Sequence, residues 1–115
     1  DAGVDLLSAP ACFTRQTGEA HWHVLQRARA IENGAYMISA AQAGQHEDGR
    51  ETFGHSLVVD PWGKVLAEAG TEPELILAEI DVHQVAATRG RIPNLNNARP
   101  FEVTFAEASV MRAAE

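Results

Sequence analysis

Cys12 is the only cysteine of this 115-residue chain, and two histidines follow it at His21 and His23. A thiol beside an imidazole can act as a nucleophile, because the imidazole takes up the proton and leaves the reactive thiolate. Cys12 lies, however, in the apolar run of residues 9–13, where a lone cysteine is more often a small buried hydrophobic side chain. The sequence therefore favours packing over catalysis for Cys12.

The histidines raise the question of a metal site. His21 and His23 are two residues apart in a helical pattern, so their side chains point about 200° apart and cannot share a metal ion. His46, Glu47 and Asp48 are adjacent in a polar stretch, where such residues are usually solvated. We therefore expect no metal site and no cofactor.

Two further hydrolase signals fail. His55 and Ser56 begin an apolar run, but Val58 stands where the nucleophile elbow G-x-S-x-G needs its last glycine. The chain also has no glycine-rich phosphate-binding motif. Lys64 follows a predicted turn, which favours a surface charge over an activated amine.

One helix is well marked after the Cys12 loop. Thr17 is a suitable N-cap, Glu19 lies in the first turn, and Asn33-Gly34 is a suitable C-terminal stop. Apolar side chains recur at helical spacing and predict one packed stripe: Ala20, Val24, Leu25, Ala28 and Ile31.

Apolar residues 4–9 and 35–41 flank this helix. A strand, a crossover helix and a second strand normally make a parallel pair in one sheet. The loop after the first strand then opens at the strand's carboxyl end, where open α/β sheets bind ligands. We expect an α/β fold with its ligand site at that end.

The next stretch predicts a loop and a hairpin. Residues 42–53 are polar and glycine-rich, which favours a loop. Residues 55–60 and 65–69 are short apolar runs separated by Asp60-Pro61-Trp62-Gly63, whose residue types suit a type I turn. These two runs are predicted to form an antiparallel hairpin.

The last third of the chain is less regular. Residues 75–80 alternate loosely and predict a fifth strand. Asp81, with Gln84 in the third helical position, predicts a helix of about two turns that Gly90 and Pro93 end. Residues 105–114 carry a weak helical signal.

Composition limits the function classes. Hydrophobic residues make up 45% of the chain and charged residues 22%, which is typical of one globular domain. The net charge of −7, without a cluster of basic residues, argues against nucleic-acid binding. The absence of an apolar run near membrane length and the single cysteine favour a soluble protein of the cytoplasm. Asp1-Ala2-Gly3 resembles the end of a helix, so we expect a piece of a longer chain.

Three motifs point to a family. Residues 17–22 (TGEAHW), 25–34 (LQRARAIENG) and 54–63 (GHSLVVDPWG) resemble the carboxy-terminal part of the nitrilase superfamily, the carbon-nitrogen hydrolases. The likeness is greatest to the amidase branch that includes omega-amidases. It continues through Ile92-Pro93 and Arg99-Pro100 and so covers most of the chain.

The resemblance implies an α-β-β-α sandwich with a mixed sheet that dimerises, and a Glu-Lys-Cys site that hydrolyses small amides or nitriles through a thioester. The family's nucleophile precedes the strand that begins here at Val4, so Cys12 does not match it. Residues 1–115 are then the carboxy-terminal portion of one domain whose catalytic residues are absent, with 92–115 as an extension. Alone, the chain is expected to be inactive. The alternative is a short, non-catalytic interaction or dimerisation module derived from the family.

The same resemblance implies substrate contacts for Phe13 and Thr17, which lie between the strand end and the helix. The competing interpretation is that Phe13 packs in the core and Thr17 only caps the helix. Expected partners are a small amide or nitrile and a second copy of the chain, with no nucleic acid and no membrane.

Overall fold

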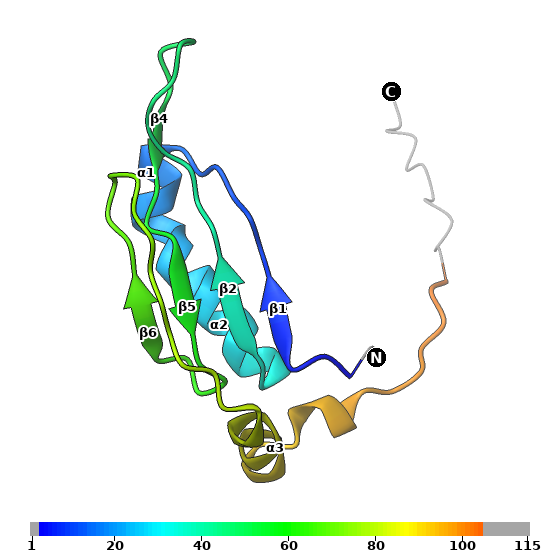
Figure 1. Cartoon of the computed structure of the whole chain (residues 1–115). Helices are drawn as coiled ribbons and strands as arrows, with labels where there is room; N and C mark the ends of the chain where they lie inside the picture. The colour runs from blue at the N-terminus through cyan, green and yellow to red at the C-terminus, as the bar shows by residue number, and fades with distance from the viewer. Residues whose placement is uncertain (1–2, 105–115) are drawn as a thin grey trace, which may run out of the picture.

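The computed structural model describes residues 3–104. Its main sheet has four strands in the order β1 (Leu6–Ser8), β2 (Tyr36–Ser39), β5 (Leu57–Val59) and β6 (Val65–Glu68). The first pair is parallel and the other two pairs are antiparallel, so the sheet is mixed. The helical segment between β1 and β2 lies against one face of this sheet (Figure 1). The predicted α/β fold and parallel crossover are confirmed.

The helical segment begins earlier than the sequence predicts. Thr14 is the N-cap, and its hydroxyl accepts a 3.4 Å hydrogen bond from the N–H of Thr17. The segment is built from α1 (Arg15–Thr17), a π-helical turn η1 (Gly18–Trp22) and α2 (His23–Asn33). The N-cap prediction for Thr17 is therefore wrong by one turn, because a second threonine three residues upstream fills that role. The stop at Gly34 is confirmed by its left-handed φ of 52°.

The predicted apolar stripe is also wrong. The buried positions of the helical segment are Gly18, Trp22, Gln26 and Ala30. By contrast, Val24, Leu25 and Ile31 are 61%, 39% and 43% exposed. Hydrophobicity alone missed the buried row because it contains a glutamine, whose Oε1 accepts a 2.7 Å hydrogen bond from the Ser39 hydroxyl. The predicted stripe forms an exposed apolar face instead.

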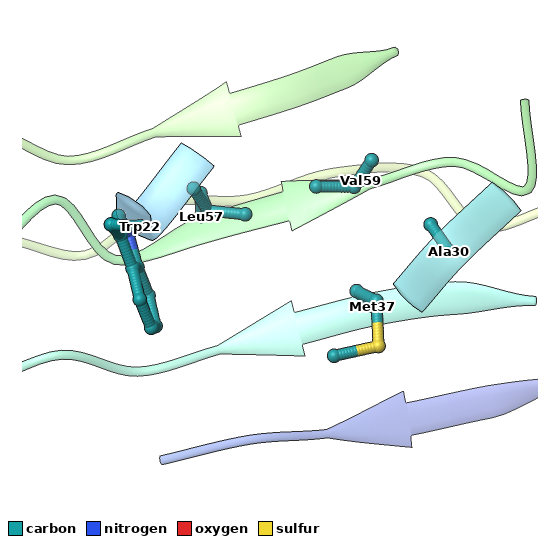
Figure 2. Close-up of a cluster of buried hydrophobic side chains, with 5 residues drawn as sticks. All are labelled: Trp22, Ala30, Met37, Leu57 and Val59. Atoms are coloured by element: carbon teal, nitrogen blue, oxygen red, sulfur yellow. The ribbon is translucent and has the colours of Figure 1, made fainter. Parts of the chain in front are cut away.

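The core lies between the helical segment and the sheet. Figure 2 shows Trp22 and Ala30 facing the strand residues Met37, Leu57 and Val59. Half-buried apolar side chains surround this cluster: Leu7, Ala9, Ala11, Phe13, Ala41, Phe53 and Val65. Several apolar side chains of the sheet strands stay partly exposed, namely Leu6, Ile38 and Leu66. The Cα radius of gyration is 19.5 Å, well above the value of about 13 Å for a compact domain of this length.

The predicted polar loop contains a second, two-stranded sheet. β3 (Ala43–Gln45) and β4 (Glu51–Phe53) pair antiparallel and project beyond the main sheet (Figure 1). The sequence carries no strand signal here, because strands of three residues are too short to show an alternating apolar pattern. The N–H of Phe53 donates to the carbonyl of Phe13 at 3.0 Å, so the hairpin is tied to the loop after β1.

The hairpin of β5 and β6 is confirmed. The Asp60 carboxylate accepts 2.9 Å hydrogen bonds from the N–H groups of Trp62 and Lys64, and Gly63 has a φ of 86°. Aspartate suits the first position of a turn because its carboxylate can accept a hydrogen bond from the backbone N–H two residues later.

The predicted fifth strand is wrong. Residues 75–80 pair with neither sheet in the described part of the chain, and Leu75 and Leu77 are 83% and 82% exposed. Alternation alone cannot make a strand, because a strand needs a partner edge for its backbone groups.

The helix predicted after Asp81 is confirmed as α3 (Val82–Arg91), with the Asp81 carboxylate accepting from the N–H of His83 at 2.9 Å. It is longer than the predicted two turns. The Gln84 side chain does not close the predicted capping box, because its Oε1 accepts from the Tyr36 hydroxyl and the N–H of Asp81 donates to that same hydroxyl.

A short 3-10 helix η2 (Asn94–Asn97) follows. The helical signal at 105–114 lies outside the described residues. Within residues 3–104, the helices are too short or too polar to cross a bilayer.

Candidate functional site

A cavity of about 560 Å³ opens at the carboxyl ends of β1 and β2. Ala11 and Ala41 continue the parallel pairing there as an isolated bridge. The Ser56 hydroxyl accepts from the N–H of Ala41 at 2.9 Å and so joins the neighbouring chain to the same place. The lining is small and mostly apolar: Pro10, Ala11, Cys12, Ala40, Ala41, Gln42 and Ser56. The ligand end predicted from the crossover is where this cavity lies.

Cys12 lies in that lining, and it is exposed. The prediction that it is a buried packing residue is therefore wrong. Its neighbours Ala11 and Phe13 are half-buried and pack against the core, so the Cys12 side chain between them faces away from it. Neither His21 nor His23 lines the cavity with it.

Neither Phe13 nor Thr17 lines the cavity, although Phe13 directly follows the lining residue Cys12. The Phe13 ring is half-buried and packs at a tilt against Trp22, with 5.3 Å between ring centroids. Thr17 is exposed, and its hydroxyl lies 2.9 Å from that of Thr14. Its own N–H is bonded to the Thr14 side chain, so this amide is not a free donor for an anionic ligand.

A second cleft, of about 320 Å³, lies between the helical segment and the β3–β4 hairpin, and its lining includes Arg15, Glu51 and His55. The Arg15 guanidinium donates to Glu51 at 2.6 Å and to Glu19 at 3.1 Å. The hydrogen bond to Glu51, more than the one to Glu19, raises the pKa of Arg15. The Arg15 charge is thus already paired with two of the carboxylates that line this cleft.

One lining residue of this cleft, His55, belongs to a cluster of three side chains that are far apart in the sequence. Oε1 of Glu68 is 2.8 Å from His23 Nε2 and 2.9 Å from His55 Nδ1. Partial burial acts to raise the pKa of the Glu68 carboxyl, but the hydrogen bonds from His23 and His55 outweigh it and hold that pKa below its usual value. The cluster is not evident from the sequence, because each of its members belongs to a different predicted element.

His55 is held in an unusual backbone conformation within the cluster. Its φ is 59°, the one positive value for a residue other than glycine in the described part of the chain. Its carbonyl accepts a 2.7 Å hydrogen bond from Trp22 Nε1, and its ring stacks on Phe53 with 4.2 Å between centroids. A positive φ is uncommon for a residue other than glycine, and such residues cluster at functional sites.

The polar residues of the β3–β4 turn do not gather around one point. His46 Nε2 lies 2.7 Å from the Thr52 hydroxyl, whereas the Asp48 carboxylate accepts from the backbone and guanidinium of Arg50. The backbone hydrogen bond from Arg50, followed by the one from its side chain, lowers the pKa of Asp48.

Comparison with known proteins shows close relatives. The family model described as carbon-nitrogen hydrolase matches residues 1–90. The chain is 48% identical over 99 residues to the deaminated glutathione amidase of Mus musculus, which covers 86% of this chain and 31% of that protein. It is 44% identical over 97 residues to omega-amidase NIT2 of the same species, covering 84% and 35%.

The structure of the Caenorhabditis elegans NitFhit protein matches with a TM-score of 0.80 and 47% identity, over 84% of this chain and 24% of that one. The chain thus spans about a third of the length of the curated relatives. It belongs to the carbon-nitrogen hydrolase family, the nitrilase superfamily.

Proposed function

We propose that this chain is the carboxy-terminal part of an enzyme that hydrolyses small amides, as an omega-amidase or a nitrilase-like amidase does, through a cysteine thioester. The reaction class is hydrolysis of carbon-nitrogen bonds other than peptide bonds. The observation that carries this proposal is the 48% identity to a protein named as an amidase over 86% of the chain. The cavity at the ends of β1 and β2 supports it, since this is where α/β sheets bind ligands.

The proposed chemistry needs three groups. A cysteine thiolate attacks the amide carbonyl, the amine leaves with a proton, and water then cleaves the thioester. A carboxylate moves the protons in both halves, and a lysine stabilises the oxyanion. By its resemblance to the family, the chain would follow these Glu, Lys and Cys residues in the sequence, so residues 1–115 alone would be inactive.

Within that enzyme, this chain would supply one wall of the substrate site. Residues 13–17 follow directly on the strand end that lines the cavity, and we propose that Phe13 and Thr17 contact the substrate there. The competing role for Phe13 is packing against Trp22. Residues 92–115 would form an extension of the same domain.

A second candidate is a non-catalytic interaction or dimerisation module derived from the family. It is favoured by the exposed apolar face of α2, formed by Val24, Leu25 and Ile31. Under either function, we expect this face to contact a second copy in a cytoplasmic homo-oligomer, because large exposed apolar patches mark interaction surfaces.

Ammonia release from small omega-amides and nitriles tests the proposal. The complete protein should turn over such a substrate, while the 115-residue chain should not. Cys12→Ala should not abolish the turnover of the complete protein, whereas replacement of the upstream nucleophilic cysteine by alanine should. Turnover by the 115-residue chain that is lost in Cys12→Ala would contradict the proposal. A complete protein without upstream Glu, Lys and Cys would favour the interaction module.

A further inference from the structure

We propose that His23, His55 and Glu68 form a binding site for a divalent zinc ion, separate from the cavity at the ends of β1 and β2. His23 begins α2, His55 precedes β5, and Glu68 ends β6. Within residues 3–104, these are the side chains that meet the geometric requirement for a shared ion, with their ligand atoms all within 4.8 Å of one another.

The donor set fits zinc. Two imidazole nitrogens and one carboxylate oxygen form a common three-residue zinc set, in which water takes the fourth position. Zinc–ligand bonds of about 2.0–2.1 Å place tetrahedral ligand atoms roughly 3.3 Å apart. The nitrogens of His23 and His55 are now 2.8 and 2.9 Å from Glu68 Oε1. Each imidazole would therefore withdraw by only about half an ångström to admit the ion.

The two rings are held in place before any ion binds. The His55 ring stacks on Phe53, and the His23 ring meets the Phe53 ring edge-on at 5.9 Å. The His55 backbone is fixed in its left-handed conformation by the hydrogen bond from Trp22. Ligands whose orientation is fixed by neighbouring groups lose little freedom on binding a metal.

The site is accessible to solvent, and both rings can present a lone pair to an ion. The three side chains remain 28–37% exposed, so an ion and its water can reach them. In the metal-free state the two nitrogens donate protons to Glu68, whereas zinc needs their lone pairs. When zinc is bound, each imidazole would therefore carry its proton on its other nitrogen.

The test is a calorimetric titration: zinc chloride is added to the complete, chelator-treated protein, and the heat of binding is measured. His23→Gln, His55→Asn and Glu68→Gln each remove one ligand conservatively, and asparagine tolerates the positive φ of position 55. His21→Gln is the matched control, because His21 is exposed on the same helical segment and lies outside the cluster. Thermal melts without zinc verify that all four variants fold.

We expect one zinc ion per chain whose dissociation constant rises at least about tenfold in each ligand variant and is unchanged in His21→Gln. Cobalt(II), added alone to the wild-type protein, should give the strong visible absorption of a tetrahedral site. Weak octahedral absorption, or zinc binding that the three ligand variants leave unchanged, would overturn the proposal. These measurements do not depend on amidase activity. Failure of the zinc proposal can therefore be distinguished from failure of the proposed function.

Discussion

The indole N–H of Trp22 donates a 2.7 Å hydrogen bond to the backbone carbonyl of His55, thirty-three positions further along the chain. Trp22 is 1% exposed and ends the π-helical turn, whereas His55 precedes the central strand β5. One side chain therefore fills the core and fixes the path of the backbone into the sheet.

Trp22→Phe should lower the free energy of unfolding of the complete protein by about 1–3 kcal/mol, because it leaves the His55 carbonyl without this donor and removes core volume. Urea denaturation measures the change. Trp62→Phe is the matched control: Trp62 is 49% exposed, and a phenyl ring can still face Arg91. Equal effects of the two substitutions would show that the hydrogen bond to His55 contributes little.

Gly18→Ala should destabilise the protein by about 1–3 kcal/mol, because a Cβ on Gly18 would lie 2.2 Å from the Cβ of Phe53. Gly90→Ala is a control of the opposite sign. A Cβ on Gly90 meets nothing within 4 Å, and alanine in a helix is favoured over glycine by about 0.5–1 kcal/mol. The melting temperatures of both variants measure these effects. A Gly18→Ala variant as stable as the wild type would refute the close packing of η1 on β4.

Phe13→Ala should lower kcat/KM of the folded complete enzyme by about tenfold or more, in addition to a stability loss of about 2–4 kcal/mol from the lost contact with Trp22. Thr17→Ser keeps the hydroxyl that contacts Thr14 and should retain most activity. Steady-state kinetics corrected for the folded fraction separate the two effects. If the folded fraction of Phe13→Ala keeps the wild-type kcat/KM, Phe13 belongs to the core alone.

The pKa of Asp48 should lie below the usual range of an aspartate. Arg50→Gln should raise this pKa only part of the way to the usual value, because the backbone N–H of residue 50 still donates to the carboxylate. Since the folded pKa is depressed, this interaction stabilises the hairpin above the unfolded pKa and is lost as the pH falls through the folded pKa. NMR titration of the carboxyl carbon measures both values. Arg29→Gln, which breaks the remote pair with Glu32, should leave the pKa of Asp48 unchanged.

The parts of the fold that follow from local chemistry could be predicted from the sequence. Gly34 ends α2 because only a residue that tolerates a positive φ fits there, and Asp81 begins α3 through its own side chain. The turn at Asp60 has the same local origin. The crossover between β1 and β2 then follows from general rules of chain topology.

The parts that depend on distant partners could not be predicted. Gln26 is buried with its amide oxygen accepting a hydrogen bond from the Ser39 hydroxyl. Ser39 is thirteen residues away, so the residues next to Gln26 do not indicate this partner. Residues 75–80 alternate like a strand but find no partner edge in the described part of the chain. The convergence of His23 and His55 on Glu68 needs the whole sheet to be assembled first.

The β5–β6 hairpin has a consequence for the order in which the chain folds. Leu57 pairs with Glu68 across one short turn, whereas Leu6 must find Tyr36 across the entire helical segment. A short loop costs less closure entropy, so we expect the hairpin to form early and to serve as the edge on which β2 and then β1 assemble. Asp60→Ala should consequently slow refolding more than it speeds unfolding, which stopped-flow measurements on the complete protein would resolve. Nascent chains would acquire this nucleus only after residue 68 has left the ribosome, so β1, although synthesised before the hairpin, would be the last of these four strands to pair.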